Sequence, residues 1–174
     1  MLIRRELPAD RSAVYDVHTS AFAERSTPGT VPVEAPLVDA LRAEGDVVPA
    51  LCLVAVEDGM VVGHVCCSRS QLDGVDHGLV GLGPLGVWRD RQKGGVGKAL
   101  MHAVLGAADA MDVPAVVLLG DPGYYSRFGF VLASEHGITP PDPEWDKYFQ
   151  IRTLSAFRPD LAGAFQYAPA IERL

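Results

Sequence analysis

The sequence lacks the features that mark several large classes of protein. Its 174 residues include only three cysteines, Cys52, Cys66 and Cys67, and no C-x-x-C pair, so neither a disulfide framework nor a zinc site is indicated. The longest uncharged apolar stretch, Val47–Val56, is far shorter than the ~20 residues that a membrane-spanning helix needs. The N-terminal MLIRRELPADRS has no apolar core of the kind found in signal peptides. These absences predict a cytoplasmic protein with reduced thiols and no membrane partner.

Positive charge is scarce as well. The 15 Lys and Arg residues stand against 22 Asp and Glu, which gives a net charge of −7 at pH 7. Domains that bind nucleic acid normally carry a basic footprint, so no nucleic-acid partner is expected. Hydrophobic residues are plentiful at 48%, enough to form a sizeable core. The length predicts a single domain over residues 1–174.

Hydrophobic periodicity predicts a mixed α/β or α+β chain. The helical segments are Ala9–Phe22, Glu34–Glu44, Gly95–Met111 and, after an Asp-Pro start signal, Gly123–Phe128. The strand segments are Leu2–Arg5, Leu51–Glu57, Val61–Arg69, Leu79–Trp88, Ala115–Leu119, Tyr148–Leu154 and Ala164–Tyr167. Gly83-Pro84 interrupts one of these strands. Because proline cannot donate to a sheet ladder, we expect a bulge or an unpaired edge there.

The most informative stretch is LGVWRDRQKGGVGKAL, residues 85–100. A strand ends, a polar glycine-rich loop follows, and a helix begins. The first amides of a helix have no intrahelical partner and lie at the positive end of the helix dipole, so they form an anion site. Glycines allow a phosphate to approach such a backbone closely. The nearby cations are Arg89, Arg91, Lys93 and Lys98. The stretch therefore predicts phosphate binding rather than an ordinary turn.

Two interpretations of this phosphate loop compete. KGGVGK resembles the variant Walker A loop of partition-type ATPases, but the position after its lysine is Ala99, which cannot supply the hydroxyl that holds Mg²⁺. The second interpretation needs neither metal nor hydroxyl. Gln92-x-x-Gly95-x-Gly97, after a strand, resembles the pyrophosphate loop of the GNAT superfamily of N-acetyltransferases. The sequence YSRFGF, which begins at Tyr125, is similar to that family's tyrosine motif, and the chain as a whole looks like the YhbS-like branch.

The resemblance implies a fold and a reaction. The fold would be a mixed, mostly antiparallel sheet of six to seven strands, flanked by helices and with a splayed central strand pair. Direct attack of an amine on acetyl-CoA would pass an acetyl group to a small-molecule or peptide acceptor through a tetrahedral intermediate, without a metal. Residues implied to bind the coenzyme are Leu85, Gly86, Val87, Gln92, Lys93, Gly94, Gly95, Val96, Gly97 and Lys98. The many members of the superfamily that hold pantetheine with an asparagine carry it seven residues before the tyrosine, where this chain has Leu118.

The residues that would move protons are less clearly marked. A phenol suits protonation of a departing thiolate, so we predict Tyr125 as the acid, with the adjacent Tyr124 as its rival. The base stays open among Glu34, which could instead line the acceptor pocket, His64, His77, an ordered water and an amine that arrives neutral. A non-catalytic acyl-CoA sensor using the same loop is the alternative from another functional class. Exposed edges near the C-terminal strands are compatible with a homodimer.

Overall fold

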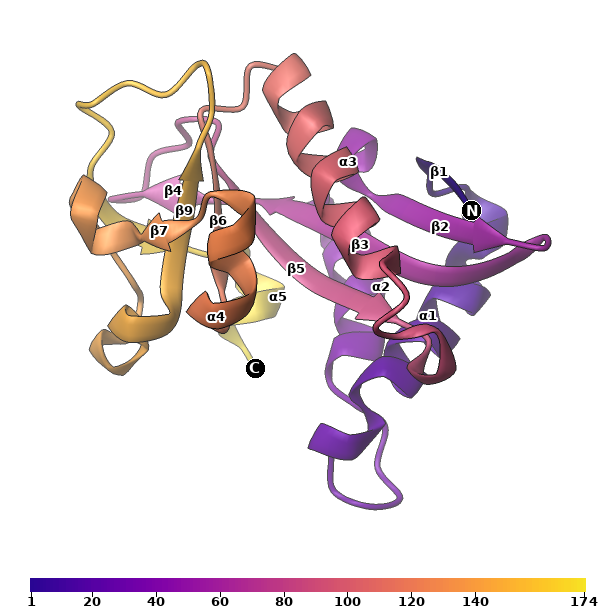
Figure 1. Cartoon of the computed structure of the whole chain (residues 1–174). Helices are drawn as coiled ribbons and strands as arrows, with labels where there is room; N and C mark the ends of the chain where they lie inside the picture. The colour runs from indigo at the N-terminus through magenta and orange to yellow at the C-terminus, as the bar shows by residue number, and fades with distance from the viewer.

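The computed structural model describes all 174 residues. Its main sheet has seven strands in the order β1-β2-β3-β5-β6-β9-β7 (Figure 1). These strands are β1 (Leu2–Arg5), β2 (Leu53–Glu57), β3 (Met60–Arg69), β5 (Val80–Val87), β6 (Ala115–Leu119), β9 (Phe149–Thr153) and β7 (Val131–Leu132). Every neighbouring pair in this sheet is antiparallel except β5 with β6. The expected mixed, mostly antiparallel sheet is confirmed.

Helices cover both faces of the sheet. They are α1 (Arg11–Phe22), α2 (Glu34–Glu44), α3 (Val96–Ala110), α4 (Pro122–Tyr125) and α5 (Pro169–Glu172). Strand alternation assigns the faces: Leu53 and Ala55 of β2 pack in the cluster that contains α3, whereas Val54 packs with α1 and α2. The sheet therefore lies between α3 on one side and the α1–α2 pair on the other (Figure 1). None of these helices has the length and apolar character needed to cross a bilayer.

The sheet opens between β5 and β6. These parallel strands pair only at Val80 and Gly81, so the rest of β5 is bonded on one side alone, to β3. The two strands diverge from there (Figure 1). The ladder between β3 and β5 is irregular opposite Gly83-Pro84, where the register shifts between Val65 and Cys67. The predicted interruption at Gly83-Pro84 and the predicted splayed pair are both confirmed, because proline cannot continue the ladder.

A second, smaller sheet lies at the C-terminal side. It joins β4 (Gln71–Leu72), β10 (Gly163–Gln166) and β8 (Ile138–Thr139). Four short elements were not predicted, because they have no measurable period: the two-residue strands β4, β7 and β8 and the four-residue helix α5. The first helix was predicted to begin at Ala9. That helical segment begins instead with a 3-10 turn over Pro8–Asp10, and α1 starts at Arg11.

Candidate active site

The loop between β5 and α3 is held in one conformation by its own residues. A 3-10 turn over Arg89–Arg91 follows β5. The Gln92 side chain then turns back, and its Nε2 donates a hydrogen bond to the Val87 carbonyl at 3.1 Å. Gly95 caps α3 with a φ of 91°, a left-handed conformation that favours glycine. Gln92, which the motif assigns to the coenzyme, thus fixes the loop to the end of the strand.

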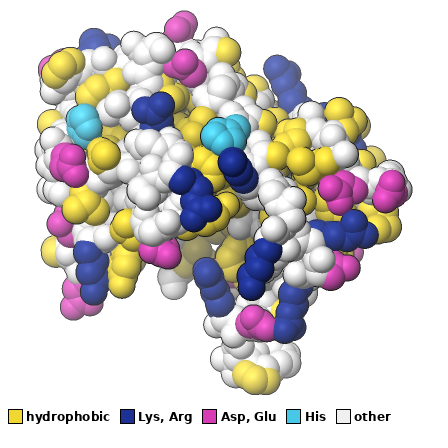
Figure 2. All heavy atoms as spheres, in the orientation of Figure 1, with side chains coloured by type: hydrophobic (Ala, Val, Ile, Leu, Met, Phe, Trp, Pro, Cys, Tyr) yellow, Lys and Arg dark blue, Asp and Glu magenta, His cyan; other side chains and the backbone are white.

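The loop carries two arginines that are paired with carboxylates and two lysines that are not. Arg91 pairs with Glu57 at 3.1 Å, and Arg89 pairs with Glu24, so carboxylates already neutralise both arginines. Lys93 and Lys98 form no ion pair with the protein. Lys and Arg side chains gather around the hollow between α4 and the first turn of α3 (Figure 2). The two lysines, with the first amides of α3, provide the positive charge at this end of the cleft.

The open side of β5 runs along the same cleft. Leu85, Gly86 and Val87 pair with Val65, His64 and Gly63 of β3, while the opposite edge of these residues has no strand beside it. A chain that lay along this edge could pair with the free main-chain groups as an added strand does. The three residues that the motif assigns to pantetheine are therefore available for such pairing.

The two tyrosines of α4 point in different directions. A Cβ at Gly97 would lie 3.2 Å from the Tyr124 hydroxyl, so this hydroxyl lies over the first turn of α3. A Cβ at Gly120 would overlap the Tyr125 ring, so Tyr125 instead covers the end of β6. Their rings meet edge to face, with centroids 4.9 Å apart. Burial, with a smaller contribution from Tyr124, raises the pKa of Tyr125 to about 12, which keeps its phenol protonated.

Three other residues singled out by the sequence make no side-chain hydrogen bond or ion pair with the glycine-rich loop or the two tyrosines. Glu34 is the first residue of α2, and its half-buried side chain makes no hydrogen bond or ion pair. His77 is exposed in the turn before β5, at the end of the strand opposite to Val87. Leu118 is buried in the core with α3, so it offers no polar group to a pantetheine chain. His77 therefore lies at the other end of β5 from the glycine-rich loop.

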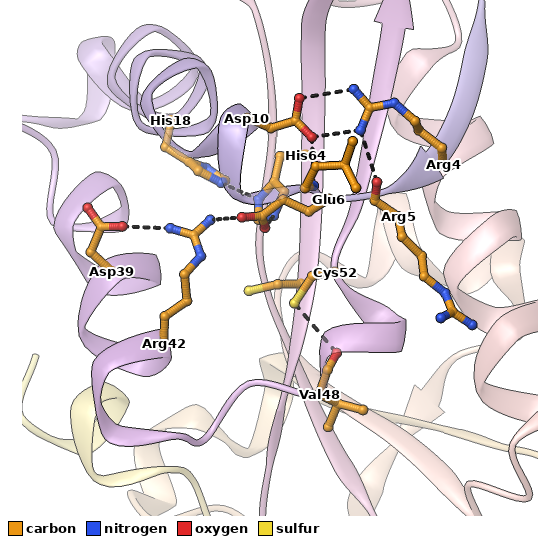
Figure 3. Close-up of polar contacts among 12 residues, drawn as sticks. Arg4, Arg5, Glu6, Asp10, His18, Asp39, Arg42, Val48, Cys52 and His64 are labelled. Atoms are coloured by element: carbon orange, nitrogen blue, oxygen red, sulfur yellow. Dashed lines mark hydrogen bonds and ion pairs between the residues drawn. The ribbon is translucent and has the colours of Figure 1, made fainter.

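His64 belongs to a buried polar network that the sequence analysis did not foresee (Figure 3). Its Nδ1 lies 2.8 Å from Nε2 of His18 in α1, and its Nε2 lies 3.0 Å from Oε2 of Glu6. Arg42 of α2 donates to the other Glu6 oxygen at 2.5 Å. The signal that could have found this network is the spacing of α1: His18 stands four residues after Val14, on the helix face that is buried.

Burial controls the charge states in this network. It lowers the pKa of His18 to about 2, with a further contribution from the nearby His64. It also lowers the pKa of His64, although the bond to Glu6 acts in the opposite direction. For Glu6, burial acts to raise the pKa, but the hydrogen bonds from His64 and Arg42 outweigh it and hold the pKa below its ordinary value. Two neutral histidines thus lie beside an ionised carboxylate.

Both the sequence and the fold of this chain are similar to those of known acetyltransferases. The acetyltransferase (GNAT) domain family matches residues 49–132. A curated Escherichia coli protein described as "uncharacterized N-acetyltransferase YhbS" is 36% identical over 156 residues, which cover 89% of this chain and 88% of that protein. The chain belongs to the GNAT acetyltransferase family. This acetyltransferase is also 31% identical over 166 residues to the Escherichia coli protein "uncharacterized N-acetyltransferase YjhQ", covering 92% and 88% of the two chains.

Solved structures extend the likeness to the whole fold. Escherichia coli YhbS in complex with CoA superposes with a TM-score of 0.89 at 32% identity, covering 99% of this acetyltransferase and 92% of that chain. A GNAT family acetyltransferase from Brucella melitensis in complex with acetyl-CoA gives a TM-score of 0.80 at 34% identity, covering 98% and 97%. The GNAT fold expected from the two motifs is confirmed, and the chain is an acetyltransferase.

Proposed function

We propose that this acetyltransferase moves the acetyl group of acetyl-CoA to a primary amine by direct attack through a tetrahedral intermediate. One observation carries the proposal: the unpaired edge of β5, the N-terminus of α3 and the tyrosines of α4 lie together at the opening between β5 and β6. A thioester on this strand edge would lie near main-chain amides that can stabilise a developing oxyanion. The two coenzyme complexes among the similar structures support the choice of acetyl-CoA.

The coenzyme site is proposed from the chemistry of its donors. A diphosphate needs hydrogen-bond donors and cations, which the first amides of α3 and the unpaired Lys93 and Lys98 supply. Pantetheine needs an extended main-chain partner, which Leu85–Val87 supply. The proposed diphosphate-binding residues are Gln92, Lys93, Gly94, Gly95, Val96, Gly97 and Lys98. Gln92 acts there by holding the loop, since its side-chain amide already binds Val87.

Tyr125 is proposed to protonate the departing thiolate. The raised pKa, about 12, keeps the phenol in its donor form at every physiological pH. It also makes the phenol a weaker acid than the ordinary value of about 10 would suggest, so the transfer depends on the high local basicity of a thiolate held in a dry cleft. Tyr124, whose hydroxyl lies over α3, is placed by contrast for contact with the phosphate end.

The acceptor is proposed to be a cationic small molecule or a peptide that carries a primary amine. The net charge of −7 attracts cations over a long range. Glu34, at the start of α2 and free of any ion pair, is proposed to line the acceptor's path. A negatively charged acceptor would gain nothing from either feature.

Two measurements together test the function. Calorimetric titration with acetyl-CoA should show binding without added magnesium. A thiol-release assay should then show CoA formation that depends on one member of a panel holding a polyamine, a lysine-containing peptide and a peptide with a free N-terminus. Binding without acceptor-dependent release from any amine would contradict the transferase proposal and favour an acyl-CoA sensor. Binding of ATP that requires Mg²⁺ would favour the ATPase interpretation.

The domain extent, the cellular location and the oligomeric state of the enzyme are proposed as well. The whole chain, residues 1–174, is proposed to act as one N-acetyltransferase domain, and a cytoplasmic location is proposed because its three cysteines are free thiols. A homodimer is proposed through β7, an edge strand of the main sheet whose Val131 is exposed. Light scattering after size-exclusion chromatography would test this association, because a monomer at high concentration would contradict it.

A further inference from the structure

The hydrogen bonds of the buried network determine which ring nitrogen of His18 and of His64 carries the proton. Glu6 is ionised and accepts from Arg42, so His64 must donate to it through Nε2. A neutral His64 then has a bare Nδ1, which must accept a hydrogen bond from the Nε2–H of His18. The reverse assignment would leave a buried N–H of His18 without an acceptor, which is rarer in proteins than an unused lone pair. His18 is thus a neutral imidazole with a lone pair on Nδ1.

That lone pair has no partner, and it faces the strand on which the thioester is expected. Nδ1 of His18 is fully buried and makes no hydrogen bond. A Cβ at Gly86 would lie 2.6 Å from it, so the imidazole rests directly against the main chain of β5 and only glycine is accommodated there. Gly86 is the central residue of the free edge Leu85–Val87. An unpartnered basic nitrogen therefore lies directly behind the strand edge that the substrates approach.

The other end of the network reaches the solvent. His18 and His64 have no exposed side-chain surface, whereas 8% of the Glu6 side chain is exposed. The chain His18–His64–Glu6 therefore begins in the interior behind β5 and ends near the surface beside Arg42 (Figure 3). It crosses α1, β3 and the segment after β1, three parts of the molecule that are distant in sequence.

We propose that His18, His64 and Glu6 form a relay that takes up the proton released by the attacking amine. This inference rests on the proposed acetyl transfer and supplies its base. The amine nitrogen loses an N–H bond as His18 gains one at Nδ1. The Nε2 proton of His18 passes to Nδ1 of His64, and the Nε2 proton of His64 passes to Oε2 of Glu6. The substrate loses one positive charge, Glu6 loses its negative charge, and both histidines end neutral.

The relay would accept a proton from the tetrahedral adduct that forms when the amine attacks the thioester. It would not accept one from the free ammonium ion. The N–H of an amine that has attacked a carbonyl is more acidic than that of a free ammonium ion, so a weaker base can remove it. The carboxylate of Glu6 stays ionised because Arg42 and His64 hydrogen-bond to it, so it has a vacant site for that proton and then releases it readily to water. His18 is the member of the relay that lies against β5, and His64 and Glu6 act through it as positioning residues.

The charged groups around the relay are few and mostly paired. On the α2 side Arg42 also bonds Asp39 at 2.6 Å. Beyond His64, Asp10 of the first 3-10 turn is held by Arg4 of β1 at 2.6 Å. Against His18 itself stand the ring of Phe22, with centroids 6.0 Å apart, and the uncharged main chain of Gly86. No free carboxylate or ammonium faces Nδ1, so its neighbours leave it neutral in the resting enzyme.

The first test is independent of turnover. Nitrogen-15 NMR of histidine-labelled protein at pH 7 should show His18 protonated at Nε2 and bare at Nδ1, with the same tautomer in His64. A protonated Nδ1 or a cationic His18 would overturn the relay. Gly86→Ala should shift the His18 signals, since the added methyl group would meet Nδ1. Unchanged signals in that variant would show that the ring does not face β5 and would likewise overturn it.

The second test uses the panel amine that the wild type acetylates fastest. In His18→Gln the amide can still donate to His64, but no basic nitrogen faces Gly86. We expect kcat to fall by about 100-fold, within the range typical of a lost general base, while KM for acetyl-CoA is unchanged. The kcat of this variant should rise with pH where that of the wild type is level. The wild type should also show a curved proton inventory in D₂O mixtures, because several protons move, and the variant a linear one.

Matched variants separate a relay from a structural role. Glu6→Gln keeps a carbonyl oxygen for His64 but cannot take up the proton, so it should also lower kcat and straighten the proton inventory. His77→Gln alters an exposed histidine outside the network and should change neither. If His18→Gln and Glu6→Gln bind CoA normally and keep the wild-type kcat and proton inventory, the relay is wrong although the transferase stands. If the wild type itself acetylates no amine, the proposed function fails first.

Discussion

The two sides of β5 are built in opposite ways. The coenzyme side is local in sequence, because the strand, the glycine-rich loop and the first turn of α3 all fall within residues 85–100. The histidine side is assembled from Glu6, His18, Arg42 and His64, which only the tertiary fold brings together. The first side has main-chain donors and surface lysines, and the second has buried side chains, among which desolvation keeps the two histidines neutral. A local motif thus indicates the coenzyme, whereas the residues of the proposed proton relay belong to no local motif.

The largest expected effect is the loss of turnover when the hydroxyl of Tyr125 in α4 is removed. Tyr125→Phe should lower kcat by about 100-fold, because a general acid typically contributes that much or more. Binding of acetyl-CoA should be unchanged, since the ring still covers the end of β6 at Gly120. Steady-state kinetics with the best acceptor would measure both quantities. Tyr124→Phe is the matched variant: if it alone lost turnover, the assignment of the acid to Tyr125 would be wrong.

The next effect tests whether the coenzyme side is made of main-chain donors. Gly97→Val would place a branched side chain at the first turn of α3, where a Cβ already comes within 3.2 Å of the Tyr124 hydroxyl. Losing one or two charge-assisted hydrogen bonds should weaken CoA binding by about 10- to 100-fold in calorimetry. Gly106→Val, in the same helix with open space around it, should leave affinity unchanged. Equal affinity of the two variants would show that the diphosphate is bound elsewhere.

The buried histidine side of β5 should make the free energy of unfolding depend on pH. The pKa of His18 is about 2 in the folded protein, below its ordinary value of 6.5. Below pH about 6.5 the unfolded chain therefore binds a proton that the folded chain does not, and the free energy of unfolding falls by about 1.4 kcal/mol per pH unit for each such histidine. Urea unfolding at pH 7, 6 and 5 should show this loss, with a shallower slope in His18→Gln. An equal slope in that variant would contradict a neutral His18.

The smallest effect concerns the two lysines of the phosphate loop. Lys93→Ala or Lys98→Ala should weaken CoA binding by about three- to tenfold at low salt, and less at high salt, because exposed charges are screened. Lys147→Ala, which changes an exposed lysine that stands over Tyr148, provides the control and should have no effect. Calorimetry at two ionic strengths would measure the difference. A loss of affinity independent of salt would show that the lysines do not act through their charge.

The sequence predicted much of the fold because its elements are strongly periodic. Glu34–Glu44 and Ala115–Leu119 have the predicted bounds, and the break at Gly83-Pro84 marks the irregular β3–β5 ladder. The two-residue strands β4, β7 and β8 could not be predicted, because they form only where the fold places a partner beside them.

The candidate site was predictable only in part, because some of its residues are brought together only by the tertiary fold. The glycine loop and Tyr125 belong to short motifs, and these stand at the cleft. His18 carried no motif, and its role depends on the bonds to His64 and on the missing side chain of Gly86. The structure also pairs Arg89 and Arg91 with carboxylates far away in the sequence, so the loop has fewer free cations than its composition indicates.

A crystal structure of the enzyme with acetyl-CoA would test the central claim most directly. The account predicts the diphosphate on the first amides of α3, pantetheine paired with Leu85–Val87, and the thioester sulfur beside Tyr125. A coenzyme bound away from the opening between β5 and β6, or a diphosphate that does not contact the start of α3, would contradict it.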